Sequence, residues 1–283
     1  MDPLIQFFAY LFLVASMLGI GLKVSGGEIR ETLQHRGLML RTLLANFLLA
    51  PVLGILLVWL VPMERELKIG FLLLALAPGG LGAVQFTSKA KGALAYAAVA
   101  TFVLSLLAAL ISPLLAAAIV PGYAGIAVPY GRVIGVLLVA LLLPLLVGVA
   151  AHHKFPKLAG ALANPIALIG TVAFLVVVVL LMGMRKEAMA ALGGRVVVTL
   201  LLFIIGSMAI GWYLGGPEGD TRRVLASATS MRNAPLCLLI AMKSFPETHT
   251  VVLVVAFSAL MIPPNLLFTL YSAIRARRAK KAQ

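Results

Sequence analysis

The sequence has little charge and a single cysteine. Only 11% of its 283 residues are Asp, Glu, Lys or Arg, whereas 62% are hydrophobic, and the mean hydropathy is +1.10. Soluble domains carry about 25% charged residues, so this composition excludes a water-soluble globule. It also excludes disorder, because disordered segments combine low hydrophobicity with high charge. Cys237 has no second cysteine for a disulfide, and no Cys/His spacing indicates structural zinc.

Acidic residues are scarce as well. There are 9 Asp and Glu against 23 Lys and Arg, which gives a formal net charge of +14. In a soluble protein this excess would indicate a nucleic-acid partner. In so apolar a chain we attribute it to cytoplasmic loops, where basic residues accumulate. We therefore predict an all-α, polytopic integral membrane protein whose surroundings are a lipid bilayer and not nucleic acid.

Apolar runs separated by short polar segments predict nine transmembrane helices of about 20 residues each. The predicted spans are 3–22, 37–61, 68–88, 93–119, 132–151, 162–183, 196–215, 224–242 and 250–274. The first run begins Met1-Asp2-Pro3, with no basic segment and no small-x-small cleavage site. We expect it to be a retained span and not a cleaved signal peptide.

The distribution of Lys and Arg predicts the orientation. The loops after odd-numbered spans, together with the C-terminal tail, hold 15 basic residues, and the opposite side holds 7. This bias places the C-terminus in the cytoplasm and the N-terminus outside, in a plasma or inner membrane. We interpret the basic tail at 275–283 as a topology anchor, and binding to anionic lipid is the alternative.

Two predicted spans contain helix breakers within apolar sequence. The third contains Pro78-Gly79-Gly80, and the eighth contains the polar run 227–233 followed by Pro235. Proline removes a backbone donor, and freed backbone groups in a bilayer are tolerated only where protein or a water-filled cavity satisfies them. Interrupted helices in corresponding parts of two halves point to a transporter's binding site. Single prolines such as Pro51 we interpret as the ordinary prolines of membrane helices.

Arg232 lies inside a predicted span, about eight residues from either end. An arginine at a helix centre costs about 2.5–3.5 kcal/mol on insertion scales, so such a charge pairs or lines a cavity. All nine acidic residues fall in loops or at span ends, and none is placed to neutralise it. The remaining partners are freed carbonyls, water or an anionic ligand. Bidentate contact with a substrate carboxylate or sulfonate, capping of carbonyls, and a misplaced span boundary all stay open.

Three segments resemble the bile acid:sodium symporter family. They are Met17–Leu22, Ala75–Gly80 continuing to Ser88–Gly92 and Thr101, and Ser230-Met231-Arg232-Asn233, which is similar to the family's Glu-x-Gly-Met-Gln-Asn motif. The resemblance covers nearly the whole chain, in the nine-span form of the family. It implies inverted repeats, two broken helices that cross near the midplane, and a core domain that moves against a panel domain. It also implies an organic anion as substrate, often coupled to sodium.

The resemblance implies a single membrane domain over 1–283. Panel helices are expected at about 3–61 and 132–183, core helices at about 68–119 and 196–274, and a cytoplasmic tail at 275–283. The residues that we expect to bind the substrate are Asn46, Gly79, Gly80, Thr229, Arg232, Asn233 and Asn265. Among them, Asn233 matches the asparagine of the second motif. Thr101 matches a threonine of the family's first sodium site and is the residual metal candidate.

The sequence departs from the family at the sodium ligands. The family's Glu is Ala228 here, its Gln is Arg232, and its Ser-Asn pair is Ala83-Val84. These changes remove hard oxygen ligands and add a cation. We therefore predict no cofactor, and a sodium-independent organic-anion transporter in which Arg232 replaces the sodium charge. The alternatives are a sodium-coupled symporter and a non-transporting receptor or scaffold. An enzyme is not expected, because Cys237 and the serines have no His or Asp partner within the spans.

Overall fold

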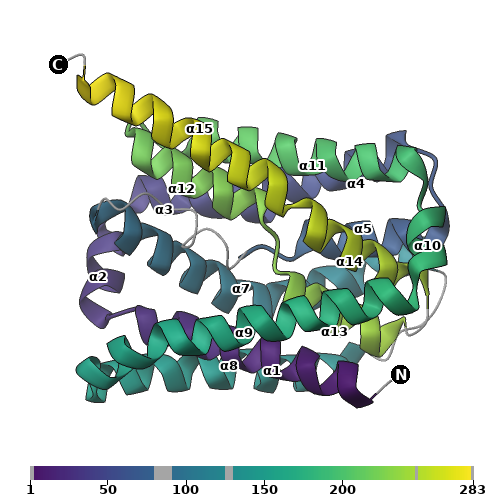
Figure 1. The fold of residues 1–283 in the computed structure, drawn as a ribbon, viewed down its shortest axis with the longest axis horizontal. Coiled ribbons are helices and arrows are strands. Elements are labelled where there is room, and N and C mark those ends of the chain that lie inside the picture. The colour runs from purple at the N-terminus through teal and green to yellow at the C-terminus, as the bar shows by residue number, and fades with distance from the viewer. Residues whose placement is uncertain (1–2, 80–90, 125–129, 246–247, 282–283) are drawn as a thin grey trace.

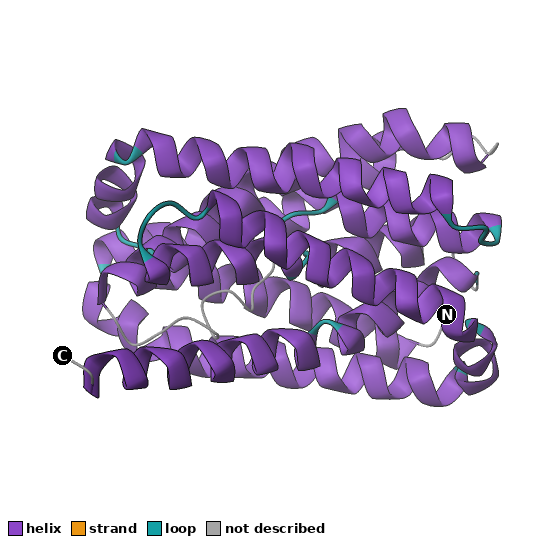
Figure 2. Ribbon diagram, turned by 90° about the horizontal axis from the view of Figure 1, so that it is seen from above, coloured by secondary structure: helices purple, strands orange, loops and turns teal. Residues whose placement is uncertain are grey.

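The computed structural model describes residues 3–79, 91–124, 130–245 and 248–281, and within these ranges every regular element is a helix (Figures 1 and 2). Six helical segments are long and apolar enough to cross a bilayer. They are Pro3–Lys23, Arg36–Leu60, Leu94–Ile119, Pro156–Met184, Gly193–Leu214 and His249–Ser272. The predicted class, an all-helical polytopic membrane protein, is confirmed, and the count of nine spans stays a prediction.

The elements follow one another with short connections. In chain order they are α1 (Pro3–Lys23), α2 (Gly26–Gln34), α3 (Arg36–Leu44), the π-helix η1 (Ala45–Leu49), α4 (Ala50–Leu60), α5 (Arg65–Leu76), α7 (Lys91–Ala124), α8 (Tyr130–Lys154), α9 (Pro156–Met184), α10 (Lys186–Ala191), α11 (Gly193–Leu214), α12 (Gly219–Ser230), α13 (Ala234–Ser244), α14 (His249–Leu260) and α15 (Ile262–Lys281).

Helices α1, α8 and α9 pack together along one side of the molecule (Figure 1). Small residues make this packing close: a Cβ atom on Gly21 would lie 2.2 Å from the carbonyl oxygen of Leu145, and one on Gly148 would lie 2.9 Å from Gly21. Glycines at such positions let helix backbones approach. The Nδ1 of His152 donates to the carbonyl of Leu22 at 2.7 Å and ties the ends of α1 and α8 together.

The segment from α3 to α4 belongs to a different packing group. It contacts α5 and α11, and α11 in turn lies along α12. Gly54 permits the approach to α5, because a Cβ there would lie 2.4 Å from the Cβ of Ala75. The sequence predicts that residues 3–61 share one panel. In the structure α1 packs mainly against α8 and α9, whereas the segment 36–60 packs mainly against α5 and α11, and the division into panel and core helices stays a prediction.

Two helices, α5 and α12, end inside the molecule. Helix α5 ends at Leu76 after 12 residues, and residues 231–233 separate α12 from α13. Both interruptions fall in the segments that contain the breakers. They lie against each other, because the N–H of Asn233 donates to the carbonyl of Ala77 at 2.9 Å. In Figure 1 the connection from α12 to α13 runs through the middle of the bundle.

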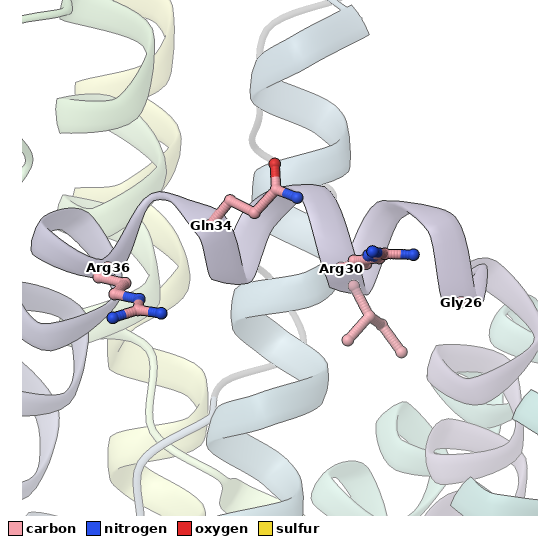
Figure 3. A pocket seen from close by; sticks show the side chains of 5 residues that line it. Gly26, Arg30, Gln34 and Arg36 are labelled. Carbon is pink, nitrogen blue, oxygen red and sulfur yellow. The ribbon is translucent and has the colours of Figure 1, made fainter.

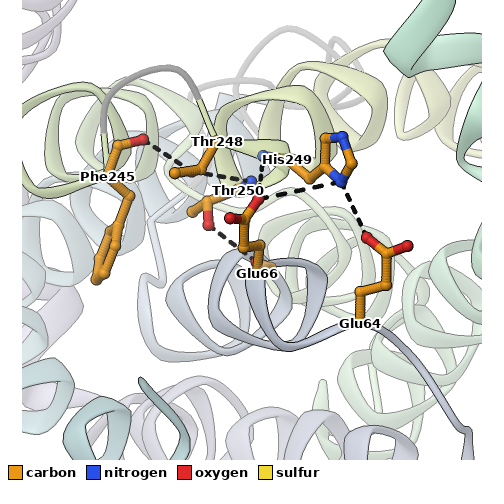
Figure 4. A network of polar contacts seen from close by, with 6 residues as sticks. All are labelled: Glu64, Glu66, Phe245, Thr248, His249 and Thr250. Carbon is orange, nitrogen blue, oxygen red and sulfur yellow. Dashed lines mark hydrogen bonds and ion pairs between the residues drawn. The ribbon is translucent and has the colours of Figure 1, made fainter. Parts of the chain in front are cut away.

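The N-termini of α5 and α14 are joined at the end of the molecule opposite α2 (Figures 1 and 4). The N–H of His249 donates to Oε2 of Glu66 at 2.7 Å, and the Thr250 hydroxyl donates to the carbonyl of Glu66 at 2.9 Å. The Nδ1 of His249 lies 2.9 Å from Oε2 of Glu64. A carboxylate is favoured at a helix N-terminus. These contacts fix the start of the interrupted helix α5 beside α14.

Candidate functional site

Arg232 lies in the break between α12 and α13 and is 1% exposed. Its guanidinium donates to four backbone carbonyls from three parts of the chain. Nε donates to Leu74 at 2.9 Å, Nη2 to Ala75 and to Asn46 at 3.5 Å, and Nη1 to Thr229 at 3.4 Å. A guanidinium has five N–H donors, and most of them are therefore engaged by carbonyl oxygens.

The α5 carbonyls are available because the sequence removes their helical donors. In an α-helix the carbonyl of residue i accepts from the N–H of residue i+4. For Leu74 that residue is Pro78, which has no N–H, and only a long bond of 3.3 Å from the N–H of Ala77 remains. For Ala75 it is Gly79, whose φ of +97° has left the helical region. The C-terminal end of a helix carries negative partial charge, so a cation is stabilised there.

The Thr229 carbonyl loses its donor in a different way. Its helical partner would be the N–H of Asn233, which instead donates to Ala77 in the other break. The side chain of Asn233 caps the next helix, because its Oδ1 accepts from the N–H of Leu236 at 3.2 Å. Its Nδ2 is buried and has no hydrogen-bond partner among the described residues. Asn233 thus orients both the break and the start of α13.

The Asn46 carbonyl is freed by the π-helix η1. The N–H of Ala50 reaches back five residues to Ala45, so it does not serve Asn46. The next possible donor is residue 51, which is Pro51 and has no N–H. Pro51, which the sequence suggests is an ordinary proline of a membrane helix, therefore leaves the Asn46 carbonyl free to accept from Arg232. The sequence alone does not predict this free carbonyl, because residue 51 is the hydrogen-bond partner of residue 46 only in a π-helix.

Side-chain bonds connect the carbonyl cluster to the surrounding helices. The Nδ2 of Asn46 donates to Oγ1 of Thr229 at 3.2 Å, and the Oδ1 of Asn46 has no partner among the described residues. At the end of α12, the Ser230 hydroxyl donates to Oδ1 of Asn265 at 2.9 Å. Asn265 also donates from Nδ2 to the carbonyl of Met261 at 2.9 Å. The role of Ser230 in holding α12 to α15 was not foreseen from the sequence.

The first break is fixed against α7. A Cβ on Gly79 would lie 3.0 Å from the backbone N of Ser105, and the Ser105 hydroxyl donates to the carbonyl of Gly79 at 3.4 Å. Thr101 lies one turn earlier on α7, is 1% exposed, and its hydroxyl has no partner among the described residues. Gly80 and the pair Ala83-Val84 lie outside the described residues.

The position of the family's carboxylate is apolar. Ala228 is 1% exposed and packs in a cluster with Leu104, against which Leu43 and Phe47 lie. Within the described ranges, no group of three His, Cys, Asp or Glu residues is arranged to hold a metal ion. The aromatic ring of Phe203 lies 5.9 Å from the guanidinium carbon of Arg232, which favours the cation.

The site therefore consists of a fixed, buried cation held by carbonyls at two helix breaks. Buried polar atoms without described partners surround the breaks: an amide NH2 on Asn233, an amide oxygen on Asn46 and a hydroxyl on Thr101. The structure brings Asn46, Thr229, Arg232 and Asn233 into one network, and it ties Gly79 and Asn265 to neighbouring helices. Which of these residues contact a substrate stays a prediction.

Comparison with known proteins relates this chain to membrane transporters. A family model described as the sodium bile acid symporter family matches residues 10–192. A rice protein (Oryza sativa subsp. japonica), named probable sodium/metabolite cotransporter BASS2, chloroplastic, is 27% identical over 238 residues, covering 81% of this chain and 55% of the relative. The uncharacterized sodium-dependent transporter YocS of Bacillus subtilis (strain 168) is 22% identical over 250 residues, covering 85% of this chain and 75% of the relative.

The chain thus spans little more than half of the rice relative and three quarters of the bacterial one. Both names describe transport proteins, and neither describes an enzyme.

Proposed function

The chain belongs to the sodium bile acid symporter family, and on that premise we propose that it is a secondary transporter that moves a small organic anion by alternating access. The observation that carries the proposal is the buried Arg232, held by four carbonyls where two interrupted helices meet. Interrupted helices near the midplane are the usual place of substrate and ion sites in secondary transporters.

We further propose that transport is independent of sodium. Unwound carbonyls and half-helix C-termini are the oxygen ligands that transporters offer to sodium. Here the guanidinium of Arg232 binds these carbonyls, and the apolar cluster around Ala228 offers no carboxylate in place of the family's Glu. Because the guanidinium of Arg232 already places a positive charge at these carbonyls, a bound sodium ion is not needed there. The site would then remain permanently in a cation-occupied arrangement.

The substrate that this arrangement favours is an anion, such as a carboxylate or a sulfonate. The positive charge of Arg232 is almost fully removed from water, and in a low-dielectric interior its attraction for an anion is only weakly screened. The Asn233 amide supplies a free donor at the N-terminus of α13, where the helix dipole also favours negative charge. In this proposal Arg232 supplies the charge and Asn233 the directed hydrogen bond.

Alternating access requires two bodies that move relative to each other. We propose that α1, α8 and α9 form the panel and that the other long helices form the core. This assignment moves the segment 36–60 from the predicted panel to the core, because it packs against α5 and α11. The inverted repeat that relates the two halves stays a proposal based on family membership.

The first test is ligand binding measured by thermal unfolding of the purified protein. A panel of carboxylates, sulfonates and sulfates is compared in sodium and in choline buffer. A ligand at 100 times its dissociation constant stabilises a protein by about 2.7 kcal/mol, which gives a readable shift. We expect one class of anion to stabilise the protein equally in both buffers. Stabilisation that requires sodium would overturn the sodium-independent reading.

The second test is flux of the identified anion into proteoliposomes. We expect Arg232→Gln to weaken anion binding more than tenfold, and Arg232→Ala to abolish uptake until millimolar methylguanidinium is added to occupy the vacated space. Arg223→Ala is the matched control, because Arg223 lies on α12, the helix that leads into the break, in a partly exposed ion pair with Asp220 at 2.9 Å. Unchanged affinity in Arg232→Gln would mean that Arg232 only caps carbonyls. Binding without flux in the wild type would indicate a receptor.

A sodium-coupled symporter is the second candidate, and the names of both relatives favour it. The buried oxygens of Asn46 and Thr101, which have no partner among the described residues, are atoms that a sodium ion could use. The two candidates differ in the choline experiment, because only the symporter loses anion binding when sodium is absent.

A further inference from the structure

A surface cavity of about 520 Å³ lies at the bend between α2 and α3, away from the proposed transport site (Figure 3). It is lined by Gly26, Ile29, Arg30, Gln34 and Arg36. Residues 26, 30 and 34 are spaced by four and therefore share one face of α2. The space beside Gly26 is open, because a Cβ there would meet no atom within 4 Å.

The polar side chains that line the cavity are suited to an anion. Arg30 and Arg36 are exposed, and neither forms an ion pair with any carboxylate in the described part of the chain. Glu28, the nearest acid before them, is engaged in a capping box: its Oε2 accepts from the backbone N–H of Ser25 at 3.0 Å and from the Ser25 hydroxyl at 2.8 Å. Glu31 projects about 100° around the helix from Arg30. The cavity therefore combines two guanidinium groups with no acidic lining residue.

The position of α2 indicates where the anion comes from. In Figure 1, α2 lies across the ends of the long helices and connects α1 to α3. In a bilayer that the long apolar helices cross, α2 would therefore lie along the membrane surface, at the depth of the headgroups. Ile29 is half-buried in the cavity wall and offers an apolar contact beside the two charges.

We propose that this cavity binds the phosphate of an anionic phospholipid in the adjacent leaflet. Guanidinium groups bind phosphate oxygens through paired, charge-assisted hydrogen bonds, and clustered basic residues at a membrane surface attract anionic lipid. The half-buried Ile29 contacts the glycerol region, which a soluble phosphate lacks. The inference depends on the membrane position of the protein and not on its transport activity, so the two proposals fail independently.

The test is native mass spectrometry of the full chain, titrated with phosphatidylglycerol and separately with phosphatidylcholine. We expect the wild type to retain phosphatidylglycerol preferentially, and the double variant Arg30→Ala/Arg36→Ala to bind it about tenfold more weakly. The control is Lys154→Ala/Lys157→Ala, which removes the same charge from exposed positions at the same end of the molecule. An equal loss in both double variants would indicate nonspecific attraction and would overturn the proposal.

A second pair of variants tests the cavity without changing any charge. Gly26→Leu fills the cavity, and Gly160→Leu is the control, because a Cβ at Gly160 also meets no atom within 4 Å. We expect only Gly26→Leu to lose the bound phosphatidylglycerol, with both variants unfolding at the wild-type temperature in phosphatidylcholine. Displacement of the lipid by millimolar inorganic phosphate, or equal binding of phosphatidylcholine, would overturn the proposal.

Discussion

The substitution Arg232→Leu tests whether the guanidinium holds the two helix breaks together. Leucine removes the donors that Arg232 supplies to four carbonyls and places an apolar side chain beside them. The bonds to Thr229 and Asn46 are 3.4 and 3.5 Å long, so those to Leu74 and Ala75 contribute most. We expect the protein to lose stability, even though the substitution removes a buried charge.

The expected loss of unfolding free energy follows from the carbonyls that the substitution leaves without a donor. A buried acceptor left without a donor costs about 1–3 kcal/mol, so two of them cost about 2–6 kcal/mol. Leu74 keeps its long bond from Ala77, and removing the charge recovers part of its desolvation penalty. A net loss of about 3 kcal/mol results, which lowers the unfolding temperature of a chain of this size by about 6–12 °C.

The assay is thermal unfolding in detergent, measured for a series of variants. Arg232→Lys keeps a charge and three donors, so we expect about half of the loss. Arg223→Leu is the control, because Arg223 forms a partly exposed ion pair, and ion pairs near the surface contribute only about 0–1 kcal/mol. If Arg232→Leu unfolds within about 2 °C of the wild type, the carbonyls do not depend on the guanidinium and the reasoning is refuted.

Two further substitutions test the supports of the site. Gly79→Ala places a side chain at a positive φ and 3.0 Å from the N of Ser105, so we expect a loss of about 1–3 kcal/mol. Gly183→Ala, with no atom within 4 Å of the new Cβ, should be neutral in the same thermal assay. Asn265→Leu removes the bond between the Ser230 hydroxyl and α15 but leaves that hydroxyl the carbonyl of Ser227 at 3.2 Å, so it should cost about 1 kcal/mol and weaken anion binding. An unchanged unfolding temperature and affinity would assign Asn265 no role.

Local features of the sequence predict much of this molecule. Composition gives the helical membrane class, and the breakers at 78–80 and 227–235 mark where α5 and α12 stop. The absence of a carboxylate near Arg232 follows from the sequence alone, and so does the reading that carbonyls are among its partners. These inferences succeed because each depends on the chemistry of neighbouring residues.

The remaining features depend on tertiary contacts. Arg232 bonds to carbonyls 157, 158 and 186 residues away, and no local pattern identifies those partners. The contribution of Pro51 depends on the register of the π-helix, and the neighbours of the segment 36–60 depend on small residues such as Gly54. The cavity at Arg30 arises from a bend between two short helices that hydropathy does not resolve.

The long separation between Arg232 and its acceptors has a consequence for biosynthesis. The carbonyls of Asn46, Leu74 and Ala75 enter the membrane more than 150 residues before their donor is translated. An unsatisfied backbone group in hydrocarbon costs several kcal/mol, so the nascent first half must keep these carbonyls hydrated or shielded until α12 and α13 arrive. Contacts between distant residues also form slowly. Insertion of Arg232 is therefore the step that closes the core, and chains truncated before it should remain open to water and to quality-control proteases.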